Sequence, residues 1–107
     1  MKKEETSEKV FERELSRFVE EREGMAVKLL SQFIKGLPDR MYLLHGSIVL
    51  FVEFKSTGKK PTKIQSYIHA KIQALGFPVF VVDSVETYEE AKNLIDHLIK
   101  MREVYGR

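Results

Sequence analysis

Apolar and polar residues follow one another along the chain with periods that change from segment to segment. Over residues 7–23 the apolar positions recur at helical spacing and form one stripe, which consists of Phe11, Leu15, Phe18 and Val19. Such a stripe is typical of an amphipathic helix that packs one face on a core. Gly24 favours a stop at this point, because glycine commonly follows the last helical turn.

The next part of the chain has the pattern of short strands. Residues 25–30 form a short apolar run that predicts a strand, and the Lys-Gly-Leu-Pro sequence at 35–38 favours a bend. Two runs rich in aliphatic, aromatic and β-branched side chains follow at 40–44 and 48–54, with His45-Gly46-Ser47 between them. Two such runs joined by three residues that include glycine predict a β-hairpin.

The second half of the chain alternates helical and strand patterns. A helix is predicted from Thr62 to Gly76 by the spacing of Ile64, Ile68, Ile72 and Leu75. The continuous apolar run at 79–82 is expected of a strand buried on both faces. A capping box from Thr87 to Glu90 predicts a last helix, whose apolar face consists of Tyr88, Ala91, Leu94, Ile95 and Leu98. The expected fold is therefore α/β, in the order α-β-β-β-α-β-α, with a mixed central sheet flanked by helices.

The composition limits the class of protein. With 107 residues, of which 43% are hydrophobic, the chain is expected to form a single domain over residues 1–107. It has no cysteine, which excludes disulfides and cysteine-based zinc sites. The N-terminus lacks the apolar stretch of a signal peptide, and the longest apolar run, at 48–52, is too short to span a membrane, so we expect a soluble, cytoplasmic protein. Because 18 basic residues against 16 acidic ones leave a net charge of only +2, an anionic partner must be inferred from local clusters.

Three charged residues stand at the predicted hairpin. Period two puts Glu53 and Lys55 on one face of their strand and Phe54 on the other, facing the core. A three-residue turn sets Asp39 opposite Glu53, whereas a two-residue turn shifts the register and separates them. Paired carboxylates repel unless a cation lies between them, and a hard divalent ion beside Lys55 would suit phosphodiester hydrolysis. The alternative is an ordinary cross-strand ion pair on an exposed sheet face.

Four segments extend this pattern in order: Gly36-Leu37-Pro38-Asp39-Arg40, Phe51-Val52-Glu53-Phe54-Lys55, Gln65 at a helix start, and Leu75-Gly76-Phe77 before the strand at 79–82. Together they resemble the VRR-Nuc (virus-type replication-repair nuclease) domain, a member of the restriction-endonuclease-like superfamily, over nearly the whole chain. Stand-alone copies of this length are similar to those of bacteriophages, which implies the host cytoplasm, and the same module ends larger DNA repair nucleases.

The resemblance assigns roles to individual residues. It implies that Asp39 and Glu53 ligate Mg²⁺ or Mn²⁺, that the backbone carbonyl of Phe54 completes the set, and that Lys55 serves catalysis. It also implies that Gln65 lines the active site. Gln65 stands three residues after Thr62, however, so it could instead close a capping box at the start of its helix.

The first helix offers two further candidate ligands. The superfamily usually contributes a glutamate from this helix, and both Glu8 and Glu12 match glutamates of the family pattern. They fall at the edge of the apolar stripe, whereas Glu20 and Glu21 point away from it. We expect one of the two to reach the metal, and the pattern does not decide which; either could instead extend into solvent.

Basic side chains cluster after the proposed catalytic strand. Lys55, Lys59, Lys60 and Lys63 lie within nine residues, where they could dock phosphates of DNA. Near the other side of the site lie Lys28, Lys35 and Arg40, although scattered basic residues also occur as ordinary solvated surface. Core packing would explain Tyr67, and His69 is expected to be a surface residue or a residue with satisfied hydrogen bonds.

These patterns together predict a Mg²⁺-dependent endodeoxyribonuclease. The preferred substrate is expected to be branched DNA in repair or recombination, because small members of the family resemble resolvases of four-way (Holliday) junctions. A two-fold symmetric junction needs two cuts, which so small a domain supplies only as a C2 homodimer. The apolar residues Leu29, Leu30, Phe33 and Ile34 could form its interface. The alternatives are a flap or single-strand nuclease and a non-catalytic DNA-binding module, and the intact Asp39, Glu53 and Lys55 argue against the latter.

Overall fold

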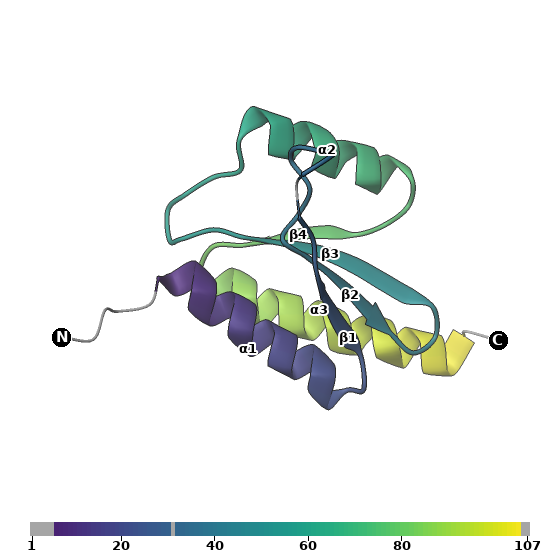
Figure 1. Ribbon diagram of the computed structural model, residues 1–107. Coiled ribbons are helices and arrows are strands. Elements are labelled where there is room, and N and C mark those ends of the chain that lie inside the picture. The colour runs from purple at the N-terminus through teal and green to yellow at the C-terminus, as the bar shows by residue number, and fades with distance from the viewer. Residues whose placement is uncertain (1–5, 31, 106–107) are drawn as a thin grey trace.

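The computed structural model describes residues 6–30 and 32–105 (Figure 1). Within these ranges the helices and strands follow the predicted order. They are α1 (Ser7–Glu21), β1 (Met25–Lys28), β2 (Arg40–Leu44), β3 (Ile48–Phe54), α2 (Lys63–Ala74), β4 (Val79–Val82) and α3 (Val85–Tyr105). No helix in this part of the chain is long and apolar enough to cross a membrane.

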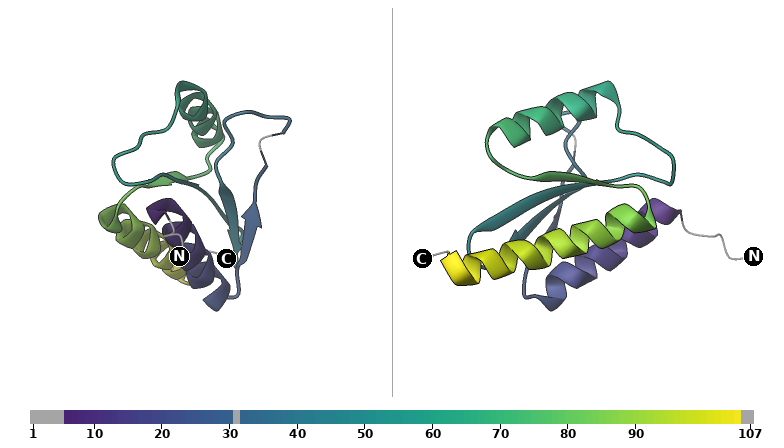
Figure 2. Two further views of the ribbon diagram at one scale, coloured as in Figure 1. Left: turned by 60° about the vertical axis from the view of Figure 1, so that its left-hand side comes forward. Right: turned by 180° about the vertical axis from the view of Figure 1, so that it is seen from behind.

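The strands form one mixed sheet in the order β1-β2-β3-β4. The pairs β1–β2 and β2–β3 are antiparallel, while β3 and β4 are parallel. Helices α1 and α3 lie side by side on one face of the sheet, and α2 lies on the opposite face (Figures 1 and 2). This arrangement confirms the predicted α/β fold with a mixed sheet flanked by helices.

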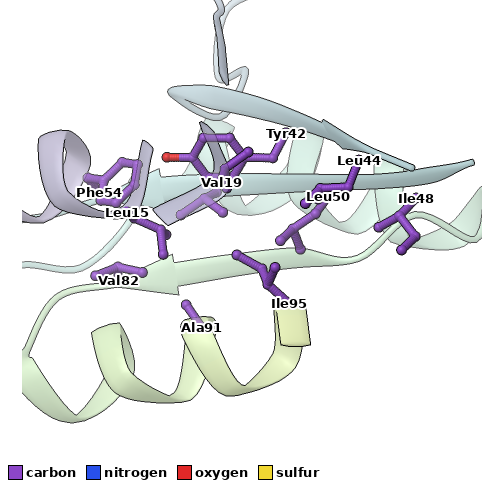
Figure 3. Packing of buried hydrophobic residues seen from close by; sticks show 11 residues of the cluster. Leu15, Val19, Tyr42, Leu44, Ile48, Leu50, Phe54, Val82, Ala91 and Ile95 are labelled. Atoms are coloured by element: carbon purple, nitrogen blue, oxygen red, sulfur yellow. The ribbon is translucent and has the colours of Figure 1, made fainter. Parts of the chain in front are cut away.

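The hydrophobic core lies between the sheet and the pair of helices α1 and α3 (Figure 3). Alternate residues of β3 point into it, as the period of a strand requires, and these are Ile48, Leu50, Val52 and Phe54. The helices contribute the buried residues Leu15, Val19, Ala91 and Ile95. On the opposite face, His69 is the one buried residue of α2. The sheet is therefore packed closely on one face and covered thinly on the other.

The end of α1 differs from its prediction. The helix ends at Glu21, and Glu23 rather than Gly24 has a left-handed backbone, with φ of 63°. Gly24 is required for space instead, because a Cβ there would lie 2.7 Å from a methyl carbon of Val19 and 2.8 Å from the carbonyl oxygen of Leu43.

Two predictions for the C-terminal half of the chain, the cap of α3 and the burial of β4, are wrong. The cap of α3 is formed by Ser84, whose Oγ accepts a hydrogen bond from the backbone N–H of Thr87 at 3.1 Å, while Thr87 Oγ1 accepts one from the N–H of Ser84 at 3.0 Å. Thr87 therefore lies inside the helix and does not begin it. Strand β4 is buried only at Val82, because it lies at the edge of the sheet under the thin cover of α2.

Candidate active site

Asp39 and Glu53 meet where the β2–β3 hairpin opens. The hairpin has a three-residue turn, and Arg40 of β2 pairs with Val52 of β3. The next step in this register sets Asp39 opposite Glu53, which is the outcome predicted for a three-residue turn. Asp39 Oδ2 accepts a hydrogen bond of 2.7 Å from the backbone N–H of Phe54, so its carboxylate is fixed beside β3.

The carboxylate of Glu53 is buried on the α2 side of the sheet, with an exposed fraction of only 2%. Its Oε2 accepts a hydrogen bond from Gln65 Nε2 at 3.1 Å and lies 3.5 Å from Lys55 Nζ. Its Oε1 has no hydrogen-bond partner among the described residues. Burial, and next the charge of Asp39, raise the pKa of Glu53 to about 7, and burial also raises the pKa of Asp39. Ionisation of this buried pair is therefore unfavourable, although the charge of Lys55 partly offsets the effect at Glu53.

Gln65 closes a capping box and also contacts Glu53. Its Oε1 accepts a hydrogen bond from the backbone N–H of Thr62 at 2.9 Å, and Thr62 Oγ1 accepts one from the N–H of Gln65 at 3.3 Å. This is a capping box at the start of α2. At the same time its Nε2 donates to Glu53. The two roles are compatible because an amide has an acceptor at one end and a donor at the other.

His69 is a site residue that was missed at the sequence level. It is 7% exposed, its Nε2 lies 3.9 Å from Glu53 Oε1, and this nitrogen has no hydrogen-bond partner in the described part of the chain. The prediction of a surface or satisfied histidine is therefore wrong. Helical spacing carried a signal, because Gln65 and His69 are four residues apart and share one face of α2. Burial, and next the charge of Lys55, lower the pKa of His69.

The two candidate glutamates of α1 have different neighbours. Glu12 Oε2 accepts hydrogen bonds from Lys28 Nζ at 2.7 Å and from Arg40 Nε at 2.8 Å. Burial opposes the ionisation of Glu12, but these hydrogen bonds outweigh it and lower its pKa. Glu8 faces the loop after β3, where its Oε1 accepts a hydrogen bond from Ser56 Oγ at 3.4 Å. Glu12 is thus engaged by two cations, whereas the hydrogen bond of Glu8 comes from a neutral hydroxyl.

A cleft of about 350 Å³ opens between the start of α1 and the loop after β3, lined by Glu8, Lys55, Ser56, Lys59, Lys60 and Thr62. The backbone N–H of Thr57 donates to Ser7 Oγ at 3.2 Å and ties this loop to α1. Lys63 is exposed on the first turn of α2, and Lys35 is exposed in the connection between β1 and β2. Tyr67 is 62% exposed, so the core-packing prediction for it is wrong.

A second groove, of about 490 Å³, is lined by residues of α1, β1 and β2. It contains Glu12 with its partners Lys28 and Arg40. The two candidate glutamates of α1 thus line different clefts, and only the cleft of Glu8 also contains Lys55.

The donor atoms fit a hard divalent cation. Over residues 6–30 and 32–105, no three His, Asp or Glu side chains lie close enough to hold a metal ion by themselves. Mg²⁺ does not require three, because it usually binds through one or two carboxylates and keeps several waters. Asp39 and Glu53 supply two carboxylates, and the unpaired Glu53 Oε1 is a buried oxygen in need of a positive partner. The carbonyl of Phe54 is a further oxygen donor on the same strand.

The fold is similar to that of a solved structure described as a VRR_NUC domain, with a TM-score of 0.76 and 29% sequence identity. The similarity covers 87% of this chain and 98% of the other. The sequence is also 44% identical over 61 residues to "Putative nuclease p44" of Acyrthosiphon pisum secondary endosymbiont phage 1. That match spans 57% of this chain and 66% of the relative, slightly less than two thirds of its length. No protein-family model matches the chain.

Proposed function

This chain belongs to the VRR-Nuc family, and on that premise we propose that it is a metal-dependent endonuclease that hydrolyses phosphodiester bonds in DNA. One observation carries the proposal: the buried carboxylate of Glu53 stands opposite Asp39 and 3.5 Å from the ammonium of Lys55. An exposed ion pair would not account for it, because Glu53 is 2% exposed and its pKa is raised by burial.

Each residue of the site has a distinct role in this proposal. Asp39 and Glu53 would hold Mg²⁺ or Mn²⁺ together with the carbonyl of Phe54. The bound ion supplies Lewis-acid stabilisation of a phosphoryl oxygen and lowers the pKa of water. Lys55 stabilises the negative charge that develops on the phosphate, because β3 fixes its ammonium beside Glu53. Gln65 orients Glu53 through its hydrogen bond to Oε2.

Glu8 is the glutamate of α1 that we assign to the cation. It lines the same cleft as Lys55. Burial is the main cause of the raised pKa of Glu53, and the charge of Glu8 adds to it. Glu12 already has two cationic partners. We therefore assign it the role of holding Lys28 and Arg40 in place beside the site.

The basic residues around the site would contact the DNA backbone. Lys59 and Lys60 line the cleft beside Lys55, and Lys63 follows them at the start of α2. Lys28 and Arg40 line the second groove, and Lys35 is exposed on the connection that follows β1. Contacts of this type fix the position of a duplex without reading its sequence.

A four-way junction is the substrate that we favour, cut by a homodimer. Two-fold symmetric cleavage needs two active sites, which a C2 dimer of this chain would provide. The connection between β1 and β2 supports such an interface, because Leu30, Phe33 and Ile34 are 65%, 95% and 52% exposed there. Exposed apolar residues grouped in this way commonly mark an interaction surface.

The test is a side-by-side cleavage assay on labelled four-way junction, flap, single-stranded and linear duplex DNA, with Mg²⁺, Mn²⁺ or a chelator. We expect paired symmetric cuts in the junction, none with the chelator, and a dimer in sedimentation. Lys55→Met should abolish the cuts, whereas the matched control Lys100→Met, at an exposed position of α3, should not. If the protein were a monomer that cuts flaps or single strands, it would be a flap or single-strand nuclease instead. If it bound DNA without cutting it, it would be a non-catalytic DNA-binding module.

A further inference from the structure

Two buried polar atoms without hydrogen-bond partners face each other in the site. They are Glu53 Oε1 and His69 Nε2, which are 3.9 Å apart, and no other buried side-chain atom of the described residues is known to lack a partner. An unpaired buried donor or acceptor costs free energy that an apolar side chain of similar shape would not. A histidine retained here for packing alone would therefore be a poor choice.

The other half of the Glu53 carboxylate is already fixed. Gln65 Nε2 and Lys55 Nζ both approach Oε2, at 3.1 Å and 3.5 Å. Oε1 has no hydrogen-bond partner in the described chain, and it lies 3.9 Å from His69 Nε2, which is a donor in one of the two neutral tautomers of the ring. Metal-bound carboxylates are in turn hydrogen-bonded by neighbouring groups, which fix their orientation.

We infer that His69 is a positioning residue, whose Nε2–H donates a hydrogen bond to Glu53 Oε1 when Glu53 binds a divalent cation. The inference rests on the proposed function in that it takes Glu53 to be a ligand of that cation. The separation of 3.9 Å must shorten by about 1 Å to reach hydrogen-bond length. A small shift of α2, whose one buried residue is His69, would be enough for this movement.

The inference separates metal affinity from fold stability. If His69 only packs, an apolar replacement changes stability and leaves metal binding unaltered. If His69 orients Glu53, the same replacement weakens metal binding while the protein keeps its melting temperature or gains, because it no longer buries an unpaired nitrogen.

The test is a calorimetric titration of Mn²⁺ into the DNA-free protein at about pH 8, where the imidazole is neutral. His69→Leu should weaken Mn²⁺ binding by about ten- to a hundredfold, as for other residues that orient metal ligands. His69→Gln should restore most of the affinity, because the amide nitrogen of glutamine reaches the place of Nε2. The shorter His69→Asn should not restore it. His45→Leu is the matched control, since His45 is exposed at the far end of β3.

Three outcomes overturn the inference. If His69→Leu bound Mn²⁺ with wild-type affinity, His69 would have a packing role only. Equal affinities of the folded His69→Gln and His69→Asn variants would contradict the proposed donor, even if His69→Leu failed to fold. If the wild-type protein bound no Mn²⁺, the proposed metal site and this inference would both be wrong. If Glu53→Gln abolished Mn²⁺ binding but His69→Leu retained it, only the inference would be wrong.

Discussion

The two faces of the sheet differ in how they are covered and in what they carry. Towards α1 and α3, Leu50 and Val52 are completely buried in an apolar core. Towards α2, the buried side chains include Glu53 and His69, and apolar residues such as Ile64 remain half exposed. The apolar face therefore provides most of the stability of the fold, and the opposite face can contain buried polar groups that weaken packing.

The largest effects are expected on the α2 face and on activity. Asp39→Asn, Glu53→Gln and Lys55→Met should each lower the cleavage rate at least about a hundredfold, because each removes a charge on which the reaction depends. Circular dichroism should show an unchanged fold, since none of the three lies in the apolar core. Near wild-type cleavage by any one variant would remove that residue from the proposed site.

Substitutions on the two faces of the sheet are expected to change the free energy of unfolding in opposite directions. Leu50→Ala should lower the free energy of unfolding by about 2–5 kcal/mol, because it leaves a cavity in the core. Glu53→Gln should instead raise it by on the order of 1 kcal/mol in metal-free protein at a pH above the Glu53 pKa of about 7, since it removes a buried charge that repels Asp39. Urea unfolding of both variants measures this. If Glu53→Gln were destabilised like Leu50→Ala, the division between the faces would be wrong.

The hairpin and its carboxylate pair could be predicted from the sequence. A three-residue turn and the period of a strand fix which residues face each other, and both act over a few neighbouring positions. The different neighbours of Glu8 and Glu12 could not be predicted, because the partners of Glu12, Lys28 and Arg40, come from strands far from it in the sequence. His69 was missed for the same reason: helical spacing gives its direction, but only the packing of α2 on the sheet buries it.

The two glutamates of α1 provide a sharper test within the site. Glu8→Gln should weaken Mn²⁺ binding by at least about tenfold, as expected for the loss of a group that binds or orients at the metal. Glu12→Gln, the matched control, should leave Mn²⁺ affinity nearly unchanged and weaken DNA binding instead, because Lys28 and Arg40 lose their common anchor. The reverse result would transfer the proposed ligand role to Glu12.

The smallest effect is expected for the lysines after β3. Replacing Lys59, Lys60 and Lys63 together with alanine should reduce the salt dependence of DNA binding by about one unit of slope for each lost phosphate contact. Binding should weaken equally on all sequences, whereas Lys55→Ala should retain binding in Ca²⁺ and lose turnover. A titration of junction affinity with salt measures this. An unchanged slope would mean that the loop lysines do not contact the phosphates, and Lys28, Lys35 and Arg40 would be tested next.

We propose that Asp39 and Glu53 hold a divalent cation at the end of β3. Anomalous scattering from crystals grown with Mn²⁺ tests it most directly, because the signal locates the ion without reference to activity. We predict one strong peak within about 2.5 Å of carboxylate oxygens of both Asp39 and Glu53. A peak elsewhere, for instance at Glu12, or no peak at a Mn²⁺ concentration that supports cleavage, would contradict the proposed site.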